Sequence, residues 1–376
     1  MPKKQNNNDA LAAQIGKLFI IGFDGVEMSP RLASLLSRIQ PAGVILFARN
    51  ITSAEQTHRL LKDCRACVST PLLTCVDMEG GKVDRFRNLN GGSPSAADVF
   101  ATGDRKLFRK HGKVIGEYCR TLGFNTDFAP VLDLAFEASR NVMSSRAVSA
   151  APEATAIYAK EFLAGLRDAG VLGCGKHFPG LGEGNLDSHH QLPVIEKSLS
   201  KLWAEDMLPY RLLRREMPFV LVSHAGYPRV TGDNVPATLS KKWITDILRK
   251  RLGYNGLVVS DDLEMGAVLQ TTSIEEATIA HIRAGGDLCL ICRTEDLIIR
   301  AYEAVLKEAE RNRLFALQVA NAAKRVEKLK KKFLPSICWR FPPIPSQNKL
   351  DRLSRRLWTF SEGVRLKNIV REQEQS

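Results

Sequence analysis

Asp187 and His189 are separated by one residue in a glycine-rich loop, so the carboxylate can orient the imidazole and raise its pKa. A His-carboxylate pair of this kind can give and take a proton near neutral pH. Lys176 and His177 stand shortly before it, at the end of an apolar run. We interpret residues 174–193 as the centre of the protein's chemistry, although an ordinary surface loop with two solvated histidines is the alternative.

Eight apolar segments along the chain are typical of buried parallel strands, and helix-like segments follow them. Eight such strand-and-helix units predict a (β/α)8 barrel of the TIM type. The polar segment 1–10 precedes this single catalytic domain, 11–333, and a basic, Pro-containing extension follows at 334–376. The predicted strands are 18–23, 43–47, 72–76, 126–132, 171–177, 219–224, 256–260 and 288–292.

Ionisable residues follow the predicted strands at the points where these end. In a barrel of parallel strands all these ends open on one mouth, where catalytic groups gather. They include Asp77 and Glu79, Asp133 and Arg146, Lys176 and His177, His224, and Asp261 and Asp262. Neighbouring side chains of a strand point to different sides, so only one of Asp261 and Asp262 can face a reacting centre.

Two parts of the sequence resemble a known family. Lys-His-Phe-Pro-Gly-Leu-Gly from Lys176, followed by Asp187-Ser-His189, is similar to the signature of the family 3 glycoside hydrolases in their N-acetylglucosaminidase branch. Leu181 departs from it, because the signature usually has His there. Asp-Met-Glu-Gly-Gly at 77–81 with the following Arg85, and the Ser-Arg context of Arg146, also match the family.

The resemblance implies a retaining exo-β-N-acetylglucosaminidase, a β-N-acetylhexosaminidase of the peptidoglycan-recycling type that needs no cofactor or metal. Asp261 would be the nucleophile, and His189, oriented by Asp187, the acid/base. In larger members another domain supplies the acid/base group, so a barrel alone must supply its own. The residues implied to hold the sugar's hydroxyl and acetamido groups are Asp77, Arg85, Arg146, Lys176 and His177.

Two other functions fit parts of the sequence. Histidines 177, 189, 190 and 224 could ligate a metal in a barrel hydrolase, but the end of the first strand lacks the His-x-His usual there. A net charge of +13 could instead let a catalytically silent barrel bind an anionic polymer. Aromatic residues do not interleave the basic ones, so we expect no nucleic-acid partner.

Composition sets the remaining expectations. No segment resembles a signal peptide or a membrane span, so we expect a cytoplasmic monomer that acts on a carbohydrate. The Cys289/Cys292 pair lies in a strand-like run and should point to opposite faces, which excludes chelation of one ion. The end of the chain predicts a tail that lies on the barrel or is partly disordered, and that can be removed without loss of the fold.

Overall fold

The computed structural model describes residues 11–184, 192–333 and 340–375. Eight parallel strands close into a barrel in the order β1-β10-β9-β8-β7-β6-β3-β2. Each of the eight predicted segments overlaps one of them, so the predicted (β/α)8 barrel is confirmed. The barrel strands are β1 (Phe19–Ile21), β2 (Gly43–Ile45), β3 (Leu73–Val76), β6 (Thr126–Asp127), β7 (Leu172–Phe178), β8 (Phe219–Val222), β9 (Leu257–Asp262) and β10 (Leu288–Ile291).

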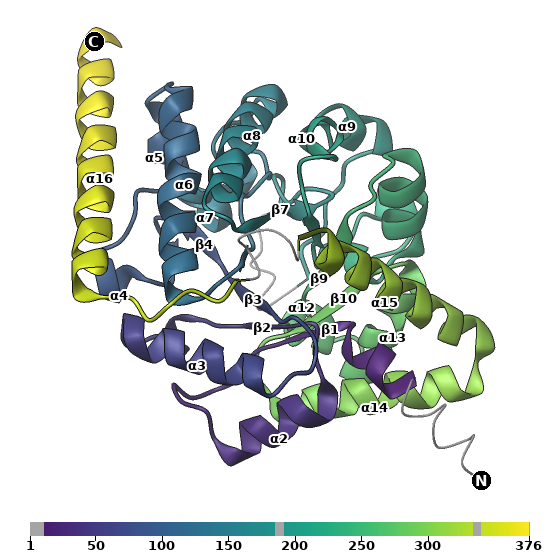
Figure 1. Ribbon diagram of the computed structural model, residues 1–376. Helices are drawn as coiled ribbons and strands as arrows, with labels where there is room; N and C mark the ends of the chain where they lie inside the picture. The colour runs from purple at the N-terminus through teal and green to yellow at the C-terminus, as the bar shows by residue number, and fades with distance from the viewer. Residues whose placement is uncertain (1–10, 185–191, 334–339, 376) are drawn as a thin grey trace.

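Helices surround the barrel (Figure 1). The helices of this outer layer are α2 (Pro30–Ile39), α3 (Ala54–Ala66), α6 (Arg105–Leu122), α8 (Pro152–Asp168), α9 (Leu199–Ala204), α10 (Leu208–Leu213), η5 (Lys242–Arg251), α13 (Ile274–Ala284), α14 (Glu295–Arg311), α15 (Arg313–Phe333) and α16 (Gln347–Gln375). Short turns of helix lie in the connections: η1 (Ala48–Asn50), α4 (Arg87–Asn90), α5 (Ala96–Ala101), η2 (Glu137–Ser139), α7 (Arg140–Met143), η3 (Ser144–Arg146), α11 (Pro228–Thr231), η4 (Ala237–Leu239) and α12 (Gly266–Leu269). A small antiparallel hairpin, β4 (Met78–Gly80) with β5 (Val83–Asp84), follows β3.

Local sequence sets where these helices begin and end. Ser53 and Gln56 form a capping box at the start of α3, and Ser273 and Glu276 form another at the start of α13. Gly123 ends α6 in the left-handed conformation, with φ of 105°. β6 is shorter than predicted because Pro130, which has no N–H to donate, follows it closely.

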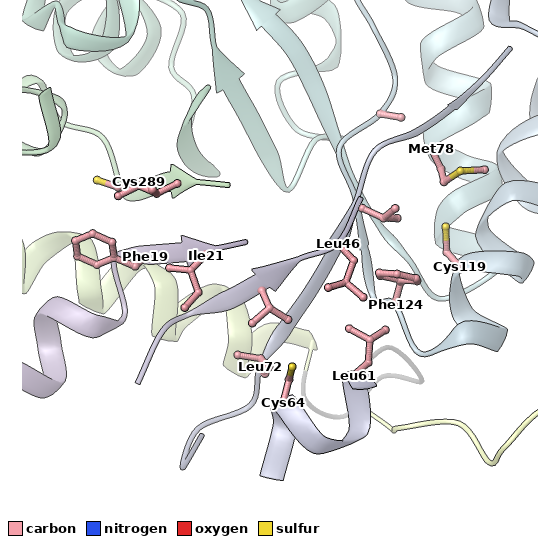
Figure 2. Packing of buried hydrophobic residues seen from close by; sticks show 14 of the residues in the cluster. Phe19, Ile21, Leu46, Leu61, Cys64, Leu72, Met78, Cys119, Phe124 and Cys289 are labelled. Carbon is pink, nitrogen blue, oxygen red and sulfur yellow. The ribbon is translucent and has the colours of Figure 1, made fainter. Parts of the chain in front are cut away.

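Side chains of the barrel strands point alternately into the barrel's interior and outward to the surrounding layer of helices. Phe19, Ile21 and Cys289 point outward into the apolar layer that includes Cys64 of α3 (Figure 2). Cys292 belongs instead to the cluster that fills the barrel. The prediction that Cys289 and Cys292 face opposite sides is therefore confirmed.

The C-terminal helix α16 packs against α5 and α6, as Figure 1 shows in yellow. Its buried residues Leu353, Leu357, Phe360 and Val364 recur every three or four positions, and they join the main apolar cluster. Residues 347–375 are thus a helix that lies on the barrel. The buried area argues against our expectation that this tail can be removed without loss of the fold. Among the described residues, no helix has both the length and the apolar composition to cross a membrane.

Phe360 and Trp358 provide a matched test of this packing. Phe360 is 1% exposed and stacks on His111, whereas Trp358 on the same helix is 67% exposed. Phe360→Ala should lower the free energy of unfolding by about 3 kcal/mol, and Trp358→Ala by less than about 0.5 kcal/mol. Urea denaturation measures both. Equal effects would show that α16 adds nothing to the stability of the barrel.

Candidate active site

The alternation of the barrel strands places charged residues directly above the apolar interior. The interior residues are Leu73 and Cys75 on β3, Leu172 and Cys174 on β7, and Leu257 and Val259 on β9. Two residues further along each strand stand Asp77, Lys176 and Asp261. Asp77 and Lys176 meet there, with their charged atoms 2.9 Å apart. The floor of the mouth is therefore apolar and its first polar layer is charged.

Lys176 is the centre of an ion network in this layer. Its Nζ lies 2.9 Å from Oδ1 of Asp77 and 2.6 Å from Oε1 of Glu79. Glu79 also accepts two hydrogen bonds from Arg146, from Nε at 2.8 Å and Nη2 at 2.9 Å. Arg85 lies 3.6 Å from Asp77. The structure thus brings together four of the predicted sugar-binding residues around Glu79, to which sequence reasoning gave no role.

The β4–β5 hairpin returns Arg85 to Asp77. Gly80 and Gly81 adopt φ of +87° and +58° in its turn, and a Cβ on Gly80 would lie 2.3 Å from the carbonyl oxygen of Pro94. The pair of glycines in the matched motif is therefore needed by the backbone.

Charge balance keeps this network ionised. Burial acts to raise the pKa of Asp77 and of Glu79. The positive charges of Lys176 and Arg85 outweigh burial at Asp77, and those of Arg146 and Lys176 outweigh it at Glu79. Both pKa values therefore lie below the ordinary range. Burial alone would lower the pKa of Lys176, yet Asp77 and Glu79 raise it. Loss of one partner would leave a buried charge uncompensated, which typically costs about 3–5 kcal/mol.

Asp127, at the end of β6, is fully buried behind this network. Its Oδ1 accepts the N–H of Met78, the residue between Asp77 and Glu79, at 2.8 Å. Within the described part of the chain its Oδ2 has no hydrogen-bond partner, and burial raises its pKa well above the usual range. This buried carboxyl group therefore fixes the backbone that carries both site carboxylates. Sequence reasoning missed it, because only the pairing of β3 with β6 brings it there.

His177 is held by Asp133, which had been noted at a strand end without a role. Nδ1 of His177 lies 2.6 Å from Oδ2 of Asp133, and the same carboxylate accepts the N–H of Leu181 at 2.7 Å. The Leu181 side chain packs in an apolar cluster. The position where this chain departs from the family signature thus contributes a backbone N–H and apolar contact.

Asp187, His189 and His190 lie outside the described residues, but both arms of their loop are described. Lys197, just beyond it, is 2% exposed, and its Nζ lies 2.7 Å from Asp206, 3.0 Å from Glu205 and 3.3 Å from Glu183. Because Glu183 precedes the loop and Lys197 follows it, this contact joins the two arms. The base of the loop is therefore held on the β7–β8 side of the mouth.

Asp261 and Asp262 have different surroundings. β9 extends through Asp262, two residues further than predicted, and its pairing with β10 shifts register between Val259 and Asp262. Its Oδ1 accepts the N–H groups of Glu264 at 3.1 Å and Cys292 at 3.2 Å. Burial first, then the charges of Glu264 and Asp261, raise its pKa to about 7. Asp262 thus shapes the turn after β9, and Oδ1 of Asp261 accepts the N–H of Asp262 at 2.9 Å.

His177 and His224 belong to the set considered for a metal. His177 is paired with Asp133, as described above, and Nε2 of His224 lies 2.8 Å from the carbonyl oxygen of Asp262. In this arrangement His224 supports the turn after β9.

The raised pKa of Asp262 predicts how stability changes with pH. The carboxyl group of Asp262 holds its proton more tightly in the folded protein than in the unfolded chain. The stability that this bound proton contributes is therefore complete below pH 4 and is lost as pH rises through about 7. Asp262→Asn keeps an oxygen for the two N–H groups but cannot ionise. The free energy of unfolding of the variant, from urea denaturation between pH 4 and 8, should therefore fall less than that of the wild type. Parallel profiles would contradict this assignment.

Comparisons with known proteins agree with the fold and the motifs. The model of the glycosyl hydrolase family 3 N-terminal domain matches residues 10–329. The chain is 32% identical over 319 residues to a beta-hexosaminidase of Idiomarina loihiensis, covering 83% of this chain and 96% of that one. A beta-hexosaminidase of Bordetella avium is 38% identical over 68% of this chain and 74% of its own.

Solved structures give the same result. A family 3 beta-N-acetylglucosaminidase of Paenibacillus superposes with a TM-score of 0.86 at 30% identity, covering 93% of this chain and 68% of that chain. A beta-N-acetylhexosaminidase of Beutenbergia cavernae gives 0.79 at 27% identity, covering 85% and 98%. The chain has the barrel, and it has the motif residues Asp77, Lys176, His177 and Asp261 at its strand ends. Because the family model and these relatives also match most of its length, the chain belongs to glycoside hydrolase family 3.

Proposed function

We propose that the protein is a retaining β-N-acetylglucosaminidase that releases terminal non-reducing N-acetylglucosamine from peptidoglycan fragments. The observation that supports the proposal is the ion network of Asp77, Glu79, Lys176 and Arg146 at the mouth of the barrel, on which β9 also opens with Asp261 and Asp262 at its end. Relatives whose names describe this activity cover most of the chain. That membership favours a glycosidase over a metal-dependent hydrolase or a silent polymer-binding barrel.

The reaction has two steps. The carboxylate of Asp261 attacks the anomeric carbon while the bond to the leaving oxygen breaks and that oxygen takes a proton from His189. Water then attacks the same carbon, His189 takes a proton from the water, and Asp261 is released from the glycosyl-enzyme. Asp187 orients His189 in both steps. A His-Asp pair in place of the second carboxylate departs from the arrangement of most glycosidases.

The ion network has donors and acceptors left for the sugar. Glu79 occupies Nε and Nη2 of Arg146, which leaves Nη1 to donate. Lys176 and Asp77, held against each other at 2.9 Å, can donate to one hydroxyl group and accept from the next. His177 keeps Nε2 for the same purpose, because Asp133 holds Nδ1. Fixed charges of both signs suit recognition of vicinal hydroxyl groups and an acetamido carbonyl.

His189→Ala tests the assignment of the acid/base. Activity should fall by about a hundredfold or more on a substrate with a poor leaving group, which needs the proton. It should fall much less on an aryl glycoside whose phenolate leaves unprotonated, and Asp187→Ala should behave as a milder version. Steady-state kinetics on both substrates measure the difference. Equal losses would mean that His189 serves the structure or binds the sugar.

Covalent labelling of Asp261 tests the proposed function itself. Asp261→Asn should reduce turnover by about a thousandfold or more, and a 5-fluoro N-acetylglucosaminyl inhibitor should label the wild-type peptide at Asp261. Asp262→Asn is the matched control and should still turn over and become labelled. Peptide sequencing by mass spectrometry locates the label. A label on Asp262, or an inactivated enzyme without any label, would overturn the proposed mechanism.

A further inference from the structure

The C-terminal helix α16 carries large apolar side chains on two opposite faces. One face packs on the barrel, and Figure 1 shows the helix lying on the outside of α5 and α6. The other face meets solvent, where Leu366 and Val370 are 53% and 52% exposed. Its apolar residues are two to three helical turns apart and so lie on one side: Trp358, Leu366, Ile369 and Val370. We call this side the outer face of α16.

Polar contacts fix the orientation of this helix along its length. The hydroxyl oxygens of Ser354 and Tyr118 lie 2.9 Å apart, and Nδ2 of Asn368 donates to the carbonyl oxygen of Asp98 at 2.9 Å. The apolar residues of the outer face therefore cannot turn inward by rotation of the helix. A face that is rigid before a partner arrives loses little entropy on binding.

Basic residues surround the outer face. α16 has seven Lys and Arg residues against four Asp and Glu, and α6 has six against one. That one carboxylate, Glu117, lies 2.8 Å from Arg356, and Lys110 of α6 reaches to 5.7 Å from the centre of the Phe360 ring. In the part of the chain that the structure describes, six exposed cations of the two helices form no ion pair: Lys106, Lys110, Lys113, Lys349, Arg352 and Arg355.

Apolar and basic side chains also line one hollow near the end of α16. It has a volume of about 350 Å³ and is lined by Thr102, Leu366, Lys367, Val370 and Arg371. Lys367 pairs with Asp104, and Arg371 donates to the carbonyl oxygen of Ala101 at 2.6 Å, so both cations are held at its wall. A phosphate group next to an apolar chain would match both kinds of lining.

The mixture of side chains distinguishes between the partners that a cationic face can bind. Nucleic acid would pair with the cations but leave Leu366 and Ile369 without contacts, and Trp358 offers one ring where a stacking platform uses several. A second copy of the chain, paired face to face, would bring the same cations together. The surface of an anionic bilayer has phosphates for the cations and an interfacial layer for Trp and aliphatic side chains.

Helix α15 is also basic but arranges its residues differently. Its exposed apolar residues Leu314 and Leu317 lie near its start, whereas the exposed Lys324 and Lys328 lie two or more turns further along. Apolar and basic residues are therefore separated on α15 and interleaved on α16. This difference makes α15 a matched control.

We propose that the outer face of α16, with the adjoining cations of α6, binds the surface of membranes that contain anionic phospholipid. Trp358, Leu366, Ile369 and Val370 enter the head-group region, and the surrounding Lys and Arg side chains pair with lipid phosphates. The inference does not depend on the proposed glycosidase function, because it uses none of the residues at the mouth of the barrel.

Vesicle sedimentation with the full chain tests the inference. One set of vesicles contains phosphatidylcholine alone, and the other contains phosphatidylcholine mixed with phosphatidylglycerol. We expect binding to the anionic vesicles to be at least about tenfold tighter, and raised salt should weaken it. The tryptophan fluorescence should shift to shorter wavelength on binding, and Trp358→Phe should lose this shift.

Variants on the two helices locate the binding face. Arg352→Gln combined with Arg355→Gln should weaken binding to the anionic vesicles about tenfold, and Trp358→Ala should weaken it about fivefold. Lys324→Gln combined with Lys328→Gln removes the same charge from α15, and Leu314→Ala removes an exposed apolar side chain there. Both controls should stay within about twofold of the wild type.

Several results would overturn the inference. Equal binding to neutral and anionic vesicles, or equal losses in the α16 and α15 variants, would show that the outer face does not bind anionic lipid. Binding to DNA but not to vesicles would make it a nucleic-acid surface. A dimer in sedimentation velocity that Trp358→Ala dissociates, without vesicle binding, would assign the face to a second copy of the chain.

Discussion

The ammonium group of Lys176 is the charge on which the mouth of the barrel depends. It lies at 4% side-chain exposure above an apolar interior, where a lone cation would be strongly disfavoured. Asp77 and Glu79 compensate it, and Glu79 in turn holds Arg146. Each of these side chains is fixed by the others, so the donors and acceptors for a sugar are oriented before it binds. Such pre-organisation is what stabilises charge that develops during a reaction.

The barrel explains how three strands deliver their charges to one layer. Parallel strands end at the same side, and alternate side chains point inward, so a charged residue two positions beyond the last apolar interior residue must enter the mouth. The pairing of β9 with β10 shifts register between Val259 and Asp262, so Asp261 and Asp262 differ in their contacts and are not separated by this rule. The carboxylate of Asp262 accepts two backbone N–H groups that form the turn after β9.

Much of the fold and part of the site could be predicted from the sequence. Apolar strand segments are local, so all eight were found, and the charged strand ends around Asp77 and Lys176 followed from them. Asp127 and Glu79 were missed as site residues because their roles depend on partners that only strand pairing and folding bring close. Whether the tail lies on the barrel was left open, because basic residues obscure the spacing of Leu353, Leu357, Phe360 and Val364.

The parts of the proposed reaction come from different strands of the ring. The loop that carries Asp187 and His189 leaves from β7, whereas Asp77 and Glu79 follow β3, and β7 and β3 are separated by β6. The contact of Lys197 with Glu183 joins the two arms of that loop at its base. A substitution in the loop therefore alters the proposed acid/base group without removing a charge from the buried network around Lys176, so proton transfer and sugar binding are tested by different variants.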